Sequence, residues 1–407
     1  MKIKYQLHIY LALVGIISLS IISCSESNDL ILPNSDIDQT TIYKISKEEA
    51  IETLNSILKI AYPPTRGEAK KGIGNVEFLT NRNPSLTRSG NSLDTIMYAI
   101  NFTNESGYAL MGTDRRSAPL YALVDNGSFS KEERTENPGF DLFMEMAESY
   151  FYTTIEESCV NTRSTRSAYD WILANRIDPK IPYRWNQGHP FNLFCPSLGN
   201  GSLSAVGCTA VATGMILAMH QKPNNINGYN LNWNKITQMK TAYDLNNDSE
   251  GCAQVARFLY ELGGKMNMSY GQESGAWPND ALNYMRNEIN MYAPQMSTYD
   301  AHANYSIYST LHFDAKGLIM MSGYRQDGNT RKGHTWILDG QIFMKDRNNP
   351  SDKQLDLYHC AWGWGGSGDG YYLRYIFDQS VGNTIEFTED SPRNYIINLE
   401  YSRIPGN

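Results

Sequence analysis

The chain has 407 residues, enough for two or three ordinary domains with a sizeable core in each. Hydrophobic residues make up 41% of it, which indicates a globular protein rather than a disordered one. The formal net charge is −8, and no cluster of basic residues stands out. Because binding to a phosphate backbone needs clustered Lys and Arg, we expect no nucleic-acid partner.

Residues 1–23 have the pattern of an export signal. Two lysines, Lys2 and Lys4, precede an apolar run of about a dozen residues, which is too short for a convincing membrane span. The run ends in Ile-Ile-Ser-Cys, which resembles a bacterial lipobox, in which the Cys receives a lipid after cleavage. We therefore expect a lipoprotein signal peptide over 1–23 and lipid attachment at Cys24. A plain secretory signal cut near Ser23 is the alternative.

The residues that follow Cys24 are polar, and 24–45 are expected to form a tether. Their first residues, Ser-Glu-Ser-Asn-Asp, resemble the acidic tether of surface lipoproteins in Bacteroides-type bacteria. The resemblance implies an exported protein that a lipid anchor holds at the outer membrane or cell surface, from which processing can release it. Five further cysteines are an odd number, so at least one thiol stays free unless it bonds to another chain.

The next part of the chain, 46–157, is expected to be a small α+β unit. Ser46 and Glu49 form a capping-box pattern that predicts a helix of about a dozen residues. The segment 63–92, rich in Pro, Gly, Arg and Asn, is predicted to be a loop. Strands over 95–102, 108–112 and 120–124 and a helix over 140–153 follow. The polar stretch 158–169 is expected to be an exposed linker that proteases can cut.

The residues suited to chemistry all lie after residue 170. Cys208 follows Gly207 and opens an apolar run to His220, which predicts a buried helix that begins at the cysteine. The positive end of the helix dipole favours a thiolate at such a position. Buried cysteines are common, so a purely structural role is the alternative for this motif alone.

Three further motifs accompany the cysteine. His334 follows an apolar strand over 317–322 and a polar loop, and it begins a strand in which an imidazole can accept a thiol proton. Trp362 lies in Trp-Gly-Trp-Gly-Gly, where an indole ring can shield an ion pair. Gln187 lies in Trp-Asn-Gln, and its amide can donate to an oxyanion. A core histidine, an aromatic hairpin and an exposed loop glutamine are the respective structural alternatives.

In this order, the motifs together resemble the streptopain family of cysteine peptidases, a branch of the papain-like clan. The match runs from Trp185 to Tyr372. It implies an α+β fold with a papain-like peptidase domain of two subdomains over 170–407, preceded by a small α+β inhibitory prodomain over 46–157. The chain would then be a zymogen, with 158–169 as its activation linker.

The resemblance also implies a role for each motif residue. Cys208 is the nucleophile, His334 is its base, and Trp362 covers the catalytic histidine. The side chain of Gln187 and the backbone N–H of Cys208 stabilise the oxyanion. The substrate cleft is bordered by Ser274, Gly275, Ala276 and Gly333. No metal or organic cofactor is implied, and the expected partners are protein or peptide substrates and the chain's own prodomain as inhibitor.

One position departs from the family pattern. The residue before the first Trp of Trp-Gly-Trp is usually an Asn that helps to orient the histidine, and here it is Ala361. We expect weakened activity rather than none, because orienting groups contribute less than the nucleophile and base. The leading hypothesis is a secreted cysteine endopeptidase. The alternatives are a surface lipoprotein that binds ligands on a protease scaffold with weak or no turnover, and an acyltransferase with the same Cys–His pair.

Overall fold

The structure, a computed structural model, describes residues 43–63, 71–80, 95–130, 137–158, 169–300, 302–327, 330–351, 354–378 and 396–406. The expected signal peptide, the lipid site Cys24 and most of the tether lie outside these residues. So does the expected linker over 158–169, apart from its two end residues. None of the helices in the described part is long and apolar enough to cross a membrane.

The N-terminal region, 43–158, has the predicted order of elements with one additional strand. Helix α2 (Lys47–Ala61) begins after Ser46, whose side chain accepts the backbone N–H of Glu49. Three antiparallel strands follow, and helix α4 (Pro138–Ser158) ends the region, extending beyond the predicted helix at both ends. The strands are β2 (Met97–Phe102), β3 (Tyr108–Gly112) and β4 (Leu120–Val124), with the short 3-10 helix η2 (Thr103–Glu105) between the first two.

The prediction of a loop over 63–92 is wrong for part of that segment. Strand β1 (Ile73–Leu79) lies there and pairs antiparallel with β2. It is the last strand of the sheet, and most of its side chains are at least partly exposed; Phe78, for example, is 50% exposed. Its sequence therefore lacks the apolar alternation by which strands are predicted, and the pairing with β2 accounts for its conformation.

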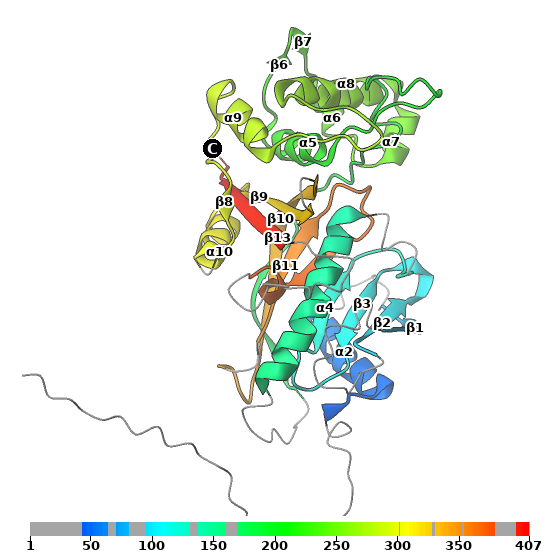
Figure 1. Cartoon of the computed structure of the whole chain (residues 1–407), viewed down its shortest axis with the longest axis vertical. Helices are drawn as coiled ribbons and strands as arrows, with labels where there is room; N and C mark the ends of the chain where they lie inside the picture. Colours follow the sequence, from blue (N-terminus) through cyan, green and yellow to red (C-terminus); the bar gives the residue numbers. More distant parts are fainter. Residues whose placement is uncertain are drawn as a thin grey trace, which may run out of the picture. The chain divides into compact units, whose positions relative to one another are not determined.

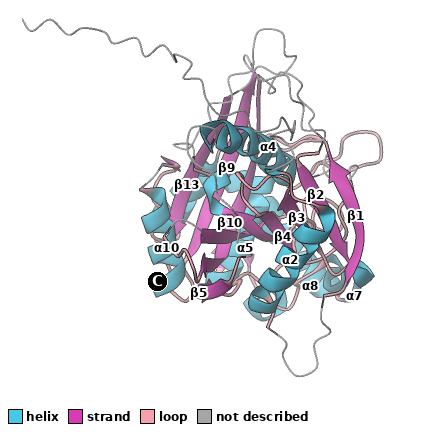
Figure 2. Cartoon of the chain, turned by 90° about the horizontal axis from the view of Figure 1, so that it is seen from below, coloured by secondary structure: helices cyan, strands magenta, loops and turns pink. Residues whose placement is uncertain are grey.

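One eleven-stranded sheet in the described residues runs through the N-terminal region and the C-terminal region, 169–406, in the order β1-β2-β3-β4-β12-β11-β10-β9-β13-β8, with β5 paired to β10. Figure 2 shows β1–β4 on one side of this sheet and β9, β10 and β13 toward the other; β12 and β11 lie between the two groups. The two regions meet where β4 pairs antiparallel with β12. The strands of the C-terminal region are β5 (Trp171–Ile177), β8 (Ser297–Thr298), β9 (Leu318–Asp327), β10 (Thr330–Asp346), β11 (Gln354–Ala361), β12 (Gly370–Leu373) and β13 (Ile396–Ile404).

The other subdomain of the C-terminal region is helical (Figure 1). Its central helix is α5 (Cys208–His220), in which every residue from Thr209 to Ala218 is buried. Around it lie α6 (Trp233–Ile236), α7 (Ala242–Asn247), α8 (Ser249–Lys265), α9 (Pro278–Asn287) and the hairpin of β6 (Asn225–Ile226) and β7 (Tyr229–Asn230). Helix α10 (Ala303–Phe313) and the 3-10 helix η3 (Arg374–Ile376) accompany the sheet. The predicted α+β class with two subdomains is confirmed.

Strand β10 separates two hydrophobic cores. Trp336 and Leu338 belong to the core that contains α4, whereas Ile337 belongs to the core around α5. Successive side chains of a strand point to opposite faces. His334 therefore lies on the face of β10 that α4 covers, and Thr335 lies on the face toward α5.

Candidate active site

Cys208 is the first residue of α5, as predicted. Gly207 before it has a φ of 91°, a conformation that favours glycine and lets the chain turn sharply into the helix. The thiol is free and half-buried. Burial raises the pKa of Cys208, but the hydrogen bond and charge of His334 outweigh this effect and lower the pKa to about 7. About half of the thiol is therefore ionised near neutral pH.

His334 lies inside β10 rather than at its start, because much of the segment predicted as a polar loop is paired strand, with Gly333 opposite Tyr324. The imidazole is 2% exposed. Its Nε2 lies 2.7 Å from the backbone oxygen of Trp362. Since a carbonyl only accepts, Nε2 carries a proton, and the neutral ring keeps its lone pair on Nδ1, where it can accept the thiol proton.

Ala361 does not leave His334 without an orienting partner. The methyl group is 3% exposed and belongs to the core around α5, while the Trp362 carbonyl holds the imidazole. The carbonyl is itself fixed, because the Trp362 backbone N–H donates to Asp369 Oδ1 at 2.8 Å and its indole N–H donates to the Gly368 oxygen at 3.0 Å. The main reason for a binding protein without turnover is thereby removed.

Three indole rings surround His334. The ring centroids of Trp362, Trp364 and Trp336 lie 6.3, 6.1 and 6.4 Å from that of the imidazole. Trp362 and Trp336 are fully buried. Trp362 therefore lies beside the histidine, tilted by 40° to its ring, and the three indole rings limit the access of water to the Cys–His pair.

Gln187 lies beside the start of α5. Its backbone carbonyl accepts the N–H of Val206 at 2.9 Å, two residues before Cys208. The Asn186 side chain accepts the backbone N–H groups of Gln187 and Gly188 and so fixes the turn. The backbone of the half-buried Gln187 is therefore held beside the start of α5, and its role as an oxyanion donor stays a prediction.

The expected cleft residues also lie near the pair. Ala276 accepts a hydrogen bond at 3.0 Å from Thr209, the residue after the cysteine, through its backbone oxygen. Gly275 exchanges two backbone hydrogen bonds with Ser269, which fixes the Ser274–Ala276 segment beside α5. Gly333 is exposed directly before His334. The structure therefore brings all of the predicted site residues that it describes to one place.

Sequence reasoning missed two threonines in this site. The hydroxyl oxygens of Thr209 and Thr335 lie 3.2 Å apart, and Thr209 donates to the Ala276 carbonyl. Both residues also help to lower the pKa of Cys208, Thr335 through its backbone N–H. Their place in the sequence, one residue after Cys208 and one after His334, is the signal that could have identified them.

The first turn of α4 lies against His334. A Cβ atom on Gly139 would be 2.4 Å from Trp362 Cε3 and 2.6 Å from His334 Cδ2. Asn137 caps this end of the helix, accepting the N–H groups of Gly139 and Phe140 at 3.1 and 3.2 Å and donating to the Ser367 oxygen at 3.1 Å. The N-terminal region thus covers the imidazole directly.

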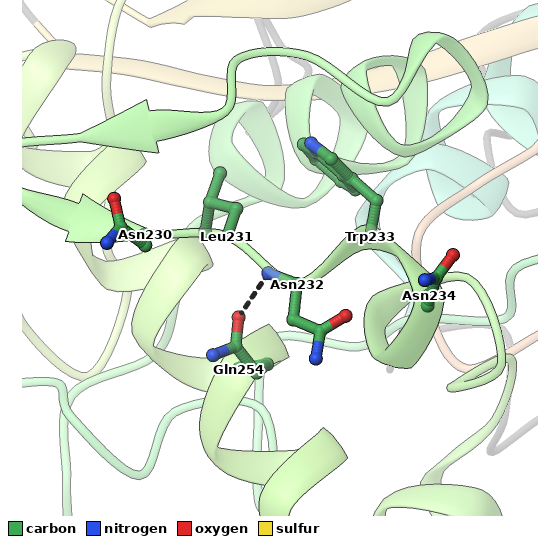
Figure 3. Close-up of a pocket in the computed structure, with 6 residues that line it drawn as sticks. All are labelled: Asn230, Leu231, Asn232, Trp233, Asn234 and Gln254. Carbon is green, nitrogen blue, oxygen red and sulfur yellow. Dashed lines mark hydrogen bonds between the residues drawn. The ribbon is translucent and has the colours of Figure 1, made fainter.

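A shallow pocket of about 480 Å³ lies in the helical subdomain (Figure 3). It is lined by Asn230, Leu231, Asn232, Trp233, Asn234 and Gln254. Its polar groups serve the fold: Gln254 accepts the Asn232 N–H at 2.9 Å, and the Asn232 side chain caps α6. None of the predicted site residues lines it.

Comparison with known proteins points to one family. Residues 185–372 match the model of the Peptidase C10 family. The chain is 23% identical to streptopain from Streptococcus pyogenes over 316 residues, which cover 68% of this chain and 73% of streptopain. It is 21% identical to the thiol protease/hemagglutinin PrtT from Porphyromonas gingivalis over 365 residues, which cover 79% of this chain and 40% of that protein.

The fold is similar to that of a solved zymogen fragment. Prointerpain A from Prevotella intermedia superposes with a TM-score of 0.55 and 16% identity, covering 81% of this chain and 97% of the fragment. The predicted papain-like fold is confirmed. Residues 185–372 thus match the streptopain, or Peptidase C10, family of cysteine peptidases, as the sequence motifs predicted.

Proposed function

We propose that the chain is a secreted cysteine endopeptidase, made as a zymogen and anchored by a lipid on Cys24, that hydrolyses peptide bonds in protein or peptide substrates. The match to a cysteine peptidase family supports this proposal. The observation that carries it is the arrangement of Cys208 at the start of α5 with His334, whose Nε2 is held by the Trp362 carbonyl. His334 lowers the pKa of the thiol to about 7 against the burial that raises it. A buried cysteine with only a structural role has no such partner, and its pKa is raised, as for Cys252.

In the proposed reaction, His334 accepts the Cys208 proton, and the thiolate attacks the carbonyl carbon of the scissile peptide bond. The Gln187 amide and the Cys208 backbone N–H donate to the oxyanion. The imidazolium then protonates the leaving amine, and a thioester remains. Water attacks the thioester, His334 takes a proton from that water, and the product acid leaves as the thiol reforms.

Residues 46–157 serve as the inhibitory prodomain in this proposal. Substrate must reach His334, because the imidazole protonates the leaving amine, yet Gly139 lies on the ring and the side chain is 2% exposed. A cut in the linker over 158–169 frees the C-terminal end of α4 from the rest of the chain. Displacement of α4 then opens the site.

Expression of residues 25–407 tests the peptidase proposal. We expect self-cleavage between about residues 150 and 170 and casein hydrolysis by the wild type and by Cys252→Ala, which removes a buried thiol in α8, and neither reaction by Cys208→Ala. If Cys208→Ala cleaves casein like the wild type, the nucleophile is wrongly assigned. Incorporation of a labelled fatty acid by the full chain, but not by Cys24→Ser, tests the anchor.

A further inference from the structure

A buried ionic cluster that the proposed mechanism does not use joins the two regions. His359 on β11 is 5% exposed. Its Nδ1 lies 2.6 Å from Asp339 Oδ1 on β10, and its Nε2 lies 3.1 Å from Asp125 Oδ2. Asp125 directly follows β4 and belongs to the N-terminal region. Because both ring nitrogens face a carboxylate, both carry a proton, and His359 is an imidazolium shared between the two regions.

The C-terminal region fixes its side of this contact. Asp339 is fully buried, and its second oxygen accepts the backbone N–H groups of Lys180 at 3.0 Å and Ile181 at 2.8 Å. These bonds hold the carboxylate, which in turn orients His359. The Nε2–H of the imidazolium therefore points at the junction of β12 with β4, as a donor for an incoming carboxylate.

The N-terminal region fixes the other side. The second oxygen of Asp125 accepts the Tyr62 hydroxyl at 2.7 Å, and Lys71 Nζ donates to the Asp125 backbone oxygen at 3.1 Å. Across the junction, the Asp125 backbone N–H also donates to the Asp369 backbone oxygen of the C-terminal region at 2.9 Å. The carboxylate is thus positioned by its own region before it meets His359, so little side-chain freedom is lost in the contact.

Next to this contact, β4 and β12 must pair in the register that brings Asp125 to His359. Val124 lies opposite Gly370, and a Cβ on Gly370 would be 2.6 Å from both the Leu123 oxygen and the Val124 Cα. Backbone pairing alone allows several registers, and a shift by one residue would carry Asp125 away from His359. The buried ion pair therefore selects one register of the junction.

We propose that His359 and Asp339 form a carboxylate receptor beside β12, and that Asp125 occupies it and so latches the N-terminal region to the C-terminal region. The ligand of this receptor is an extended strand that ends in an aspartate, here residues 120–125. The proposal rests on the inhibitory role proposed for 46–157, and it names the residue that retains the inhibitor after the linker is cut.

The charge states of His359 and Asp125 support a latch over a wide pH range. Burial lowers the pKa of His359, but Asp339 and Asp125 raise it to about 10. Burial raises the pKa of Asp125, but the hydrogen bond from His359 brings it below its ordinary value. Relative to the unfolded chain, the stabilisation from the cluster is complete between about pH 3.9 and 6.5. It declines as the pH rises from there to about 10, where the imidazolium loses its proton, and as the pH falls through the lowered pKa of Asp125. The other ionisable groups around the pair are Tyr62, Lys71, Arg176, Asp178, Asp369 and Tyr371.

The test uses residues 25–407 with Cys208→Ala, so that no self-cleavage occurs, and a site-specific protease sequence in the linker. After the cut, the two halves are diluted and their dissociation constant is measured. We expect Asp125→Asn to weaken the complex about 30-fold or more, because it leaves His359 buried without its second carboxylate. Glu48→Gln removes the same charge from an exposed side chain of α2 and is expected to change nothing.

A double-mutant cycle with His359→Asn separates the latch from a general loss of stability. We expect Asp125→Asn to have little further effect once His359 has been replaced. Three results would each overturn the latch. The first is that the losses of affinity from the two substitutions add, and the second is that the Asp125→Asn complex is as tight as the Glu48→Gln complex. The third is that the parent complex separates as soon as the linker is cut. Because these proteins lack the nucleophile, casein hydrolysis by the wild type decides the proposed function independently.

Discussion

Replacing His334 with alanine is expected to lower kcat/KM of the activated enzyme by at least about 10³-fold. Two losses combine. The general base is removed, and the thiol loses the group that ionises it. Burial raises the pKa of Cys208, and His334 is the main influence that brings it down to about 7. Without the imidazole, the burial effect dominates, and the thiolate fraction at pH 7 falls from about half to a few per cent or less.

The pH dependence of Cys208 alkylation by iodoacetamide directly measures how far the thiol loses its ionisation. We expect the midpoint to rise by more than about one pH unit in His334→Ala. Thr209→Val is the graded comparison, since it keeps the side-chain shape and removes one hydroxyl beside the thiol. It is expected to raise the midpoint less and to lower kcat/KM by about 10-fold or less. Identical alkylation profiles for wild type and His334→Ala would show that the two side chains do not interact.

Replacing Gly139 with valine is expected to make the uncut chain reactive. The added Cβ would lie 2.4 Å from the Trp362 ring and 2.6 Å from the His334 ring, and both rings are buried. Since neither ring has room to move, the first turn of α4 must leave the site. Overpacking of this kind costs about 1–3 kcal/mol, so we expect Cys208 of the uncut chain to be alkylated about 5- to 100-fold faster.

Thr153→Val is the matched control for this variant. Thr153 lies on the same helix near its other end, where its hydroxyl donates to the Ser149 oxygen within α4. The control is expected to leave the alkylation rate of the uncut chain within about twofold of the wild type. If Gly139→Val and Thr153→Val react alike, contact of α4 with His334 does not keep the site closed.

The sequence predicts most elements that have a strong local pattern. Strands β3 and β4 match their predicted ranges because each is a short apolar run bounded by turn residues. Helix α5 begins at Cys208 as predicted, because Gly207 allows the turn and the apolar run follows at once. Strand β1 was missed, since its exposed side chains give no apolar pattern and only β2 makes it a strand.

The site likewise contains residues that a local pattern predicts and contacts that no local pattern predicts. Cys208, His334 and Trp362 could be selected as site residues from motif order, because each side chain has a distinct chemistry. The group that holds His334 could not, since the Trp362 carbonyl is a backbone atom that every residue possesses. The contact of Asp125 with His359 was equally hidden, because it joins residues 234 positions apart and the local pattern around either residue gives no sign of the other.

The shared sheet also bears on how the C-terminal region reaches its fold. Strand β12 has four residues, and its partner β4 lies far away in the sequence. Strands β2, β3 and β4 pair with near neighbours, so they form early and offer an edge to which β12 can add. The proposed activation would remove strands β2, β3 and β4. The mature enzyme is then expected to stay folded because its barrier to unfolding is high, not because it refolds readily. A molecule that unfolds after activation is therefore expected not to recover.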